Sequence, residues 1–358
     1  MIFVLMLAAS LWGLATMLRM PTQAKFLMMG ILYVAVLIVL EALPVRSPLR
    51  EMTVGEPALW LILGGFLLLF LAYRQLLIWL RTRAHSEEAS EAPRPSGSTF
   101  SEIELKRYAR HIVLRELGGP GQKRLKEARV LVIGAGGLGA PALQYLAAVG
   151  VGTIGVIDDD LVENANLQRQ VIHTDARIGM PKVFSAQVAI EAQNPYVIVL
   201  PYHRRLTEDI AARLFADFDV ILDGTDNFDT RYLANRAAAA VGIPLVSGAL
   251  SQWEGQLSVF HPVDGGPCYQ CIFPEAPAPE LAPSCAEAGV LGPLPGVIGS
   301  MMAVEAVKLI TGAGIALKGQ MLIYDALYSE TRTITLKRRA DCPICGQYAM
   351  QTSIAGDS

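Results

Sequence analysis

The sequence has few charged and few aromatic residues, and its positive and negative charges nearly cancel. Charged residues make up 18% of the 358 residues and aromatic residues 7%. The 33 acidic side chains slightly outnumber the 30 basic ones, which gives a net charge of −3 at pH 7. Proteins that bind nucleic acids through the phosphate backbone carry a basic excess. The composition therefore argues against a nucleic-acid partner.

Cysteine is also scarce, with five residues in the chain. Four of them form two C-x-x-C pairs, Cys268/Cys271 and Cys342/Cys345, and the fifth is Cys285. A small secreted domain stabilised by disulfides would contain more cysteines in a shorter chain. The paired spacing instead favours a metal site in a reducing compartment.

Charge is missing altogether from long stretches near the N-terminus. Residues 1–18 and 57–73 contain no charged side chain, and residues 26–45 contain only Glu41. Because about 20 helical residues span a bilayer, residues 1–83 are predicted to form about three transmembrane helices. Two spans are the alternative, because the first run is borderline in length, and buried helices of a soluble protein are a third possibility.

Basic residues that follow the last apolar run set the expected orientation. Arg74, Arg81 and Arg83 lie directly after it, and basic residues concentrate on the cytoplasmic side of membrane proteins. We therefore expect a multi-pass protein of the inner (plasma) membrane whose catalytic part is cytoplasmic. Residues 84–100, rich in Pro, Ser and Glu, are expected to form a flexible linker to a globular domain at 101–346, followed by a tail at 347–358.

The globular part begins with a helical pattern over 101–117 and continues as a βαβ unit. A β run at 130–133 leads into a G-x-G-x-x-G loop, a helix at 140–149 follows, and a second β run at 153–157 ends at Asp158; the glycines of the loop region are Gly134, Gly136, Gly137 and Gly139. Such a loop lets the backbone approach phosphates, and the acid can bind a ribose hydroxyl.

Further β runs are expected at 197–200, 220–222, 245–246, 255–261 and 321–325. The first three alternate with helical stretches, whereas the last two do not. The predicted fold class is α/β: a Rossmann-like, mostly parallel sheet extended by antiparallel strands, with an N-terminal transmembrane helical segment.

Three side chains beyond the glycine loop indicate chemistry at a phosphate. Arg169 follows Asn166 in the segment Asn-Leu-Gln-Arg-Gln, Lys182 follows Pro181, and Asp226 precedes Asn227 at the end of a β run. Two cations can neutralise charge that develops on phosphates, and a carboxylate can hold Mg²⁺. Each residue alone is more often a surface or capping residue, so the argument depends on the set. Hydride transfer does not require this set.

The two C-x-x-C pairs match the pattern of a structural zinc site. Four thiolates form a closed tetrahedral shell around Zn²⁺ and leave no open position for catalysis. The alternative for such pairs is a redox dithiol.

Residues 101–346 resemble the adenylating enzymes of the ubiquitin-activating superfamily, and within it the MoeB/ThiF/HesA branch. The resemblance includes Arg107–Leu114, the glycine loop, the Asn166–Gln170 segment, Pro181–Val183, Thr225–Asn227 and both cysteine pairs. It covers nearly the whole globular part. The membrane segment departs from the family pattern, because members are usually soluble.

The resemblance implies that ATP adenylates the C-terminal glycine carboxylate of a ubiquitin-like sulfur-carrier protein that ends in Gly-Gly, with release of pyrophosphate. A sulfur donor, either a sulfurtransferase or a cysteine desulfurase, would then open the anhydride during biosynthesis of molybdopterin, thiamine or a related cofactor. It also implies that Asp158 holds the ribose, that Gly137 lines the pocket and that Asn166 and Arg169 contact phosphates. Lys182 would stabilise the transferred group and Asp226 would bind magnesium.

Two further roles come from the resemblance alone. Arg110 would reach into the neighbouring subunit's site in a homodimer. Cys285 would form a covalent link to the activated carrier, the alternative being an idle thiol.

Three other functions remain open from the sequence. An NAD-dependent, membrane-tethered oxidoreductase would explain the glycine loop and Asp158 but would leave Arg169, Lys182 and Asp226 without a role. A non-catalytic scaffold that binds carrier proteins would not need those three residues. An enzyme that adenylates a carboxylate on a modified tRNA base is disfavoured by the near-neutral charge.

Overall fold

The computed structural model describes residues 2–18, 22–42, 44, 47, 60–62, 64–66, 69–70, 72–76, 100–276 and 289–346. It divides into two compact units, residues 1–90 and 91–358, which are described separately. Cys285, the predicted tail 347–358 and all but the last residue of the predicted linker lie outside the described residues.

The N-terminal unit contains two apolar helices, α1 (Ile2–Met17) and α2 (Thr22–Ala42). The hydroxyl of Tyr33 on α2 donates a hydrogen bond to the carbonyl oxygen of Trp60. Among the described residues, one helix is both long enough and apolar enough to cross a bilayer. It is α13 (Pro293–Thr311), which belongs to the other unit and is half buried there. The most apolar parts of α1 and α2, Met6–Met17 and Leu27–Ala42, are shorter.

The second unit is built on an eight-stranded mixed sheet with the order β3-β2-β1-β4-β5-β6-β7-β8. The first five strands in this order are parallel, and β6, β7 and β8 are added antiparallel. The strands are β1 (Arg129–Ile133), β2 (Thr153–Ile157), β3 (Ile198–Tyr202), β4 (Val220–Asp223), β5 (Leu245–Leu250), β6 (Glu254–Phe260), β7 (Gln320–Asp325) and β8 (Glu330–Thr335).

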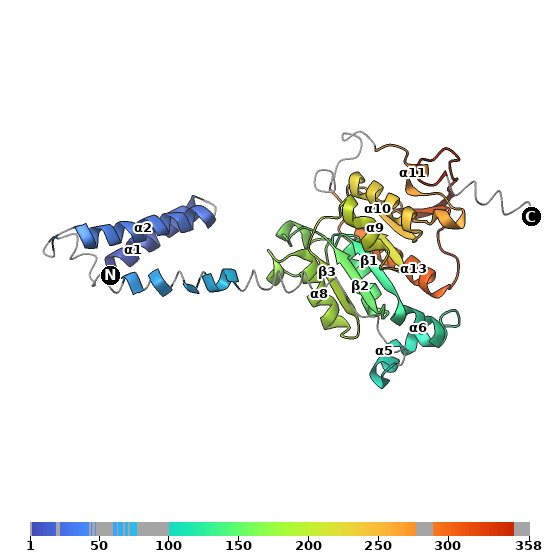
Figure 1. Ribbon diagram of the computed structural model, residues 1–358, viewed down its shortest axis with the longest axis horizontal. Helices are drawn as coiled ribbons and strands as arrows, with labels where there is room; N and C mark the ends of the chain where they lie inside the picture. The colour runs from blue at the N-terminus through green and yellow to red at the C-terminus, as the bar shows by residue number, and fades with distance from the viewer. Residues whose placement is uncertain are drawn as a thin grey trace, which may run out of the picture. The chain divides into compact units, whose positions relative to one another are not determined.

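Helices cover both faces of the parallel part (Figure 1). One face packs against α7 (Gly139–Ala148), α8 (Lys182–Gln193) and α13, and the other packs against α9 (Glu208–Phe215) and α10 (Phe228–Val241). Successive side chains of a strand point to opposite faces. Accordingly, Val130 and Val132 of β1 belong to the first core, whereas Leu131 and Ile133 belong to the second.

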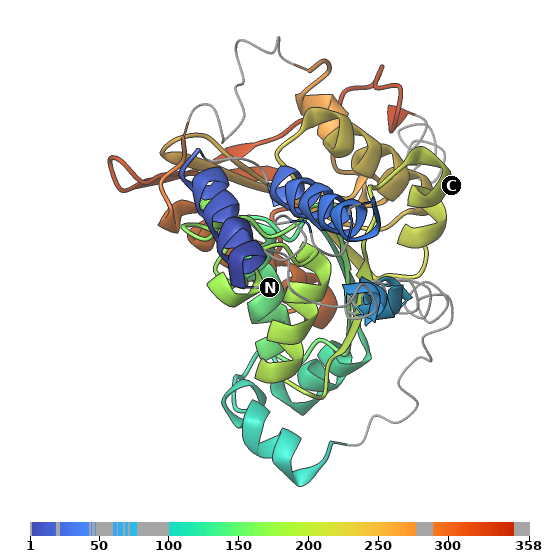
Figure 2. The same cartoon turned by 90° about the vertical axis from the view of Figure 1, so that its left-hand side faces the viewer.

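Two short helices, α5 (Glu102–Ile112) and α6 (Gly118–Glu127), lie together at the amino ends of the strands (Figures 1 and 2). Ser101 and Glu104 form the predicted capping box on α5. Helical spacing was predicted over 101–117, and the structure confirms a helix over the first part, up to Ile112. A turn at 113–117 then leads into α6, whose first residue, Gly118, has φ +60°, a left-handed conformation that favours glycine.

The fold class is confirmed for the α/β part, including the antiparallel extension. All seven predicted β runs are strands, with ends shifted by a few residues at most. The sequence did not predict β8. Its six residues are all exposed and mostly polar, so the strand lacks the run of apolar residues by which the other strands were predicted. Figure 2 shows the β7–β8 hairpin, in orange-red, reaching out beyond the helices.

Candidate active site

A cavity of about 1260 Å³ lies at the carboxyl ends of the parallel strands. The loops after β2, β1 and β4, which are neighbours in the sheet, contribute to its wall. Open α/β sheets bind ligands at this position, where the strand order reverses. The predicted residues that line the cavity are Gly134, Gly136, Gly137, Asp158, Arg169, Lys182, Asp226 and Asn227.

The glycine loop joins β1 to α7 and brings its backbone close to neighbouring elements. Gly134 has φ +88°, which is strained for any residue with a Cβ. A Cβ on Gly139 would lie 1.8 Å from the carbonyl oxygen of Gly134, so the turn closes only with glycine there. Gly139 therefore shapes the loop at the start of α7 and is absent from the cavity lining.

His173 stabilises the glycine loop through a hydrogen bond to its backbone. Its ring nitrogens lie 2.9 Å from the Ala135 carbonyl oxygen and 2.9 Å from Ser185 Oγ. Burial lowers the pKa of His173 to about 4, so the ring is neutral at physiological pH. The whole residue is buried, and both ring nitrogens are used in these contacts.

Asp158 follows β2 and is tied to the glycine loop. Its carboxylate accepts hydrogen bonds from the backbone N–H groups of Ala135 and Asp160, both at 2.8 Å. Burial raises the pKa of this carboxyl group, and the nearby Lys182 ammonium acts in the opposite direction. The carboxylate is thus held at the position from which a Rossmann-type site binds a ribose.

The two predicted cations reach the cavity from different segments. Lys182 is the first residue of α8, and its side chain is only 7% exposed. Its Nζ lies 2.7 Å from Asp160 Oδ2. Arg169 passes close to the glycine loop, since its Cδ would lie 3.8 Å from a Cβ on Gly137.

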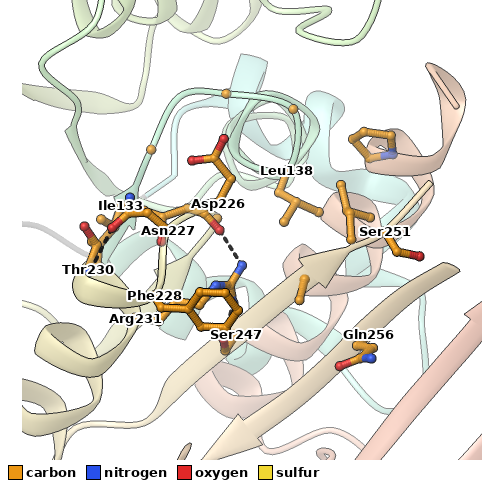
Figure 3. Close-up of a pocket in the computed structure, with 18 of the residues that line it drawn as sticks. Ile133, Leu138, Asp226, Asn227, Phe228, Thr230, Arg231, Ser247, Ser251 and Gln256 are labelled. Carbon is orange, nitrogen blue, oxygen red and sulfur yellow. Dashed lines mark hydrogen bonds between the residues drawn. The ribbon is translucent and has the colours of Figure 1, made fainter. Parts of the chain in front are cut away.

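Asp226 lies in the turn between β4 and α10, and Figure 3 shows its carboxylate pointing away from Arg231. The carboxylate is exposed, and no hydrogen bond or ion pair joins it to another part of the chain that the structure describes. Its neighbour Asn227 caps α10, because its Oδ1 accepts a hydrogen bond from the backbone N–H of Thr230 at 2.9 Å. The oxygens of Asp226 are therefore available to a ligand.

Arg231 is a residue of the cavity wall that the sequence reasoning missed (Figure 3). It is 6% exposed, forms an ion pair with Asp223 at 3.6 Å and donates to the carbonyl oxygens of Thr225 and Gly248. These contacts hold the turn that carries Asp226 against β5. The sequence feature that could have indicated Arg231 is its position one helical turn after the capping residue Asn227.

Besides Gly139, two predicted residues do not reach the cavity. Asn166 ends a short 3-10 helix, and its carbonyl oxygen accepts hydrogen bonds from the backbone N–H groups of Arg169 and Gln170. It thereby shapes the segment that positions Arg169. Arg110 is exposed on α5, at the amino ends of the strands, whereas the cavity of the same chain lies at their carboxyl ends.

The four paired cysteines come together in space. Cys268, Cys271, Cys342 and Cys345 are at most 5% exposed, and their sulfur atoms lie within 4.8 Å of one another. The backbone N–H of Arg339 points at Cys271 Sγ at 3.5 Å. Four converging thiols fit the tetrahedral S₄ donor set that Zn²⁺ prefers, so this cluster can hold a zinc ion.

The cavity thus combines the glycine loop, the Asp158 carboxylate, the predicted cations Arg169 and Lys182 and the free carboxylate of Asp226. Such a group can bind a nucleoside triphosphate and stabilise charge during displacement at a phosphorus atom. The cysteine cluster contributes no residue to the cavity wall.

Comparison with known proteins finds relatives over most of this domain. The chain is 49% identical over 259 residues to the sulfur carrier protein adenylyltransferase of Thermus thermophilus, which covers 71% of this chain and 96% of that protein. It is 50% identical over 244 residues to the SAMP-activating enzyme E1 of Haloferax volcanii, which covers 68% and 90%, respectively. The adenylyltransferase/sulfurtransferase MoeZ of Mycobacterium tuberculosis, assigned as probable, is 53% identical over 249 residues, but the chain spans only 64% of its length.

Solved structures share the fold. The crystal structure of Escherichia coli MccB with MccA-N7isoASN superposes with a TM-score of 0.60 at 19% identity, over 70% of this chain and 77% of that one. The ThiF family model matches residues 108–344, about two thirds of the chain. The match includes the glycine loop, the residues of the cavity wall and three of the four clustered cysteines, Cys268, Cys271 and Cys342, and the chain therefore belongs to the ThiF family.

Proposed function

We propose that this protein is an adenylyltransferase that activates the C-terminal carboxylate of a ubiquitin-like sulfur-carrier protein with ATP. The observation that carries the proposal is the cavity in which Asp158, Arg169, Lys182 and Asp226 meet the glycine loop. Relatives named for this activity, at 49–53% identity, support the substrate class.

The residues of the cavity divide the work of the reaction. The glycine loop and the start of α7 hold phosphates, and Asp158 accepts hydrogen bonds from the ribose. The carrier carboxylate attacks the α-phosphorus, a new carboxyl–phosphorus bond forms, and the bond to the bridging oxygen breaks as pyrophosphate leaves. Lys182 and Arg169 neutralise the negative charge that builds up on the phosphate oxygens.

Two metal ions belong to the proposal. The free, exposed carboxylate of Asp226 suits a magnesium ion, which neutralises phosphate charge when bound. The cysteine cluster suits a structural zinc ion, and its two halves are 71 residues apart, from Cys271 to Cys342. Zinc would therefore link the segment after β6 to the C-terminal end of the domain.

The full-length protein is expected to catalyse ATP–pyrophosphate exchange only when a carrier that ends in Gly-Gly is present. The reason is that exchange requires a carboxylate that can enter the cavity and attack the α-phosphorus. The measurement is incorporation of labelled pyrophosphate into ATP, with the intact carrier and with the same carrier lacking its last glycine as the matched control. Equal exchange with both carriers, or tight NADH binding with no exchange, would contradict the proposed activity.

We also propose that residues 1–83 hold the protein in the inner (plasma) membrane as a multi-pass segment. The support is the apolar surface of α2, where Leu27, Ile31 and Ile38 are each at least 60% exposed. Water-exposed apolar surface of this kind is unfavourable, whereas lipid would cover it. The basic residues after the last apolar run would then place the adenylating domain in the cytoplasm.

This anchoring gives a simple expected result. The full chain should sediment with membranes and resist extraction by carbonate, whereas residues 84–358 should stay in the supernatant. The measurement is fractionation followed by exchange activity in each fraction. Full-length protein that stays in solution without detergent would rule out the anchor without affecting the proposed adenylation.

Other parts of the proposal concern partners. Arg110 is exposed and does not line the cavity of its own chain, which suits a role in the site of a second copy in a homodimer. A sulfur donor would consume the acyl-adenylate, either directly or through a link to Cys285.

A further inference from the structure

We infer that Asp160 is a positioning residue that holds the Lys182 ammonium in the cavity, an inference that rests on the proposed adenylation. The two charged groups meet at 2.7 Å, and they differ sharply in exposure. The Lys182 side chain is 7% exposed, whereas that of Asp160 is 66% exposed. Lysine is almost never fully buried unless it is paired.

The backbone brings these two side chains together. The Lys182 N–H donates to the Asp160 carbonyl oxygen at 2.9 Å, and Leu161 and Pro181 form an antiparallel bridge beside them. Val162 continues the pairing, since its N–H donates to the Met180 carbonyl oxygen and its own carbonyl accepts from Gly179. The segment after β2 and the segment before α8 are therefore paired antiparallel by backbone hydrogen bonds, and this pairing places Asp160 opposite Lys182.

Asp160 is in turn tied to the ribose-binding carboxylate. Its N–H donates to Asp158 Oδ1 at 2.8 Å, while Asp158 Oδ2 accepts from the N–H of Ala135 in the glycine loop. A continuous chain of hydrogen bonds thus runs from the phosphate-binding loop through Asp158 and Asp160 to Nζ of Lys182. Because each link is short, the ammonium is fixed relative to the nucleotide site before any ligand arrives.

This arrangement differs from an ordinary surface ion pair. Exposed pairs contribute little because both long side chains move and water screens them. Here one partner is buried, and the backbone of both partners is held by hydrogen bonds. An ammonium has three donors, so one can remain on Asp160 while the others turn to phosphate oxygens. Preorganised charge of this kind accelerates a reaction without reorganisation at the moment of transfer.

The test uses the full-length Asp160→Asn protein, which keeps the side-chain shape but removes the charge. Asp175→Asn is the control, since it removes the same charge from an exposed side chain that does not line the cavity. With an intact Gly-Gly carrier, we expect kcat for exchange to fall by about 10- to 100-fold in Asp160→Asn, while KM for ATP changes less than about threefold. Asp175→Asn should stay within about twofold of the parent, and Asp160→Glu should recover part of the loss.

A double substitution tests whether Asp160 acts through Lys182. If it does, adding Asp160→Asn to Lys182→Ala should cause no further loss of the residual exchange rate. An equal additional loss in that background would overturn the inference, as would exchange within twofold of the parent in Asp160→Asn alone. A pure KM effect, with kcat unchanged, would overturn it as well.

A second readout does not depend on catalysis. Acylation of lysines by a water-soluble succinimidyl ester, read by mass spectrometry, should be at least about threefold faster at Lys182 in Asp160→Asn, because the paired ammonium is released. Lys123 on α6, whose side chain is 51% exposed, should react at the same rate in all variants. Unchanged labelling of Lys182 would overturn the inference even if the parent protein showed no exchange, so this failure is distinct from failure of the proposed function.

Discussion

Replacing Lys182 with alanine is expected to abolish carrier-dependent ATP–pyrophosphate exchange, which means a fall of at least about 10³-fold. Loss of a single preorganised neutral donor commonly lowers a rate by about 10²–10³-fold, and Lys182 supplies a full charge from a buried position. Its Nζ is also paired with Asp160, beside Asp158, the carboxylate proposed to hold the ribose. Removal of the ammonium should therefore take away the charge stabilisation that we propose for the departing pyrophosphate.

The control for this substitution is Lys123→Ala, on the exposed face of α6 and outside the cavity. It should leave exchange within about twofold of the parent, because surface ion pairs of this kind contribute little. Thermal unfolding of both variants would show whether the fold is retained. Full exchange by folded Lys182→Ala would eliminate the assignment of this cavity as an adenylation site.

Replacing Cys345 with serine is expected to remove bound zinc and to lower the thermal midpoint of the adenylating domain by roughly 10 °C. Structural zinc sites contribute folding free energy directly, and loss of about 3–5 kcal/mol in a domain of this size lowers the midpoint by roughly 6–20 °C. The cluster joins α11 (Tyr269–Ile272), after β6, to residues beyond β8. The C-terminal part of the domain would lose this link first.

Metal content by mass spectrometry and the midpoint by calorimetry are the two measurements. Cys285→Ser is the matched control, because Cys285 belongs to neither C-x-x-C pair, and it should keep one zinc ion per chain and the parent midpoint. A strong chelator added to the parent protein should reproduce the effect of Cys345→Ser. Stoichiometric zinc and an unchanged midpoint in Cys345→Ser would show that the cluster does not hold a structural ion.

Much of the site could be predicted from the sequence because its residues sit in short local patterns. The glycines of the loop could be recognised from the sequence because glycine adopts backbone conformations that other residues avoid, as Gly134 does with φ +88°. Asp158 and Asp226 each follow a β run, and parallel strands bring their carboxyl ends to the same edge of the sheet. The four cysteines have ligand spacing that predicts their convergence across a long separation.

The contributions of Asp160 and Arg231 could not be predicted in this way. Asp160 meets Lys182 only because residues 160–162 pair with residues 179–182, a contact that leaves no periodic signal in the chain. Arg231 looks like a surface residue of a helix, yet its guanidinium is buried against Asp223 and the carbonyl of Gly248. In both cases the polar partners lie on other segments.

The sequence by itself determined the type of sheet, the glycine loop and the four clustered cysteines. Each depends on residues that are close in the chain or that share the same chemistry. Only the tertiary structure decided which charged side chains face the cavity, that Gly139 supports the loop from outside the cavity, and that Arg110 lies at the opposite edge of the sheet. The physical reason is that a charged side chain is placed by the partners that offset its desolvation, and those partners come from distant segments that only folding brings together.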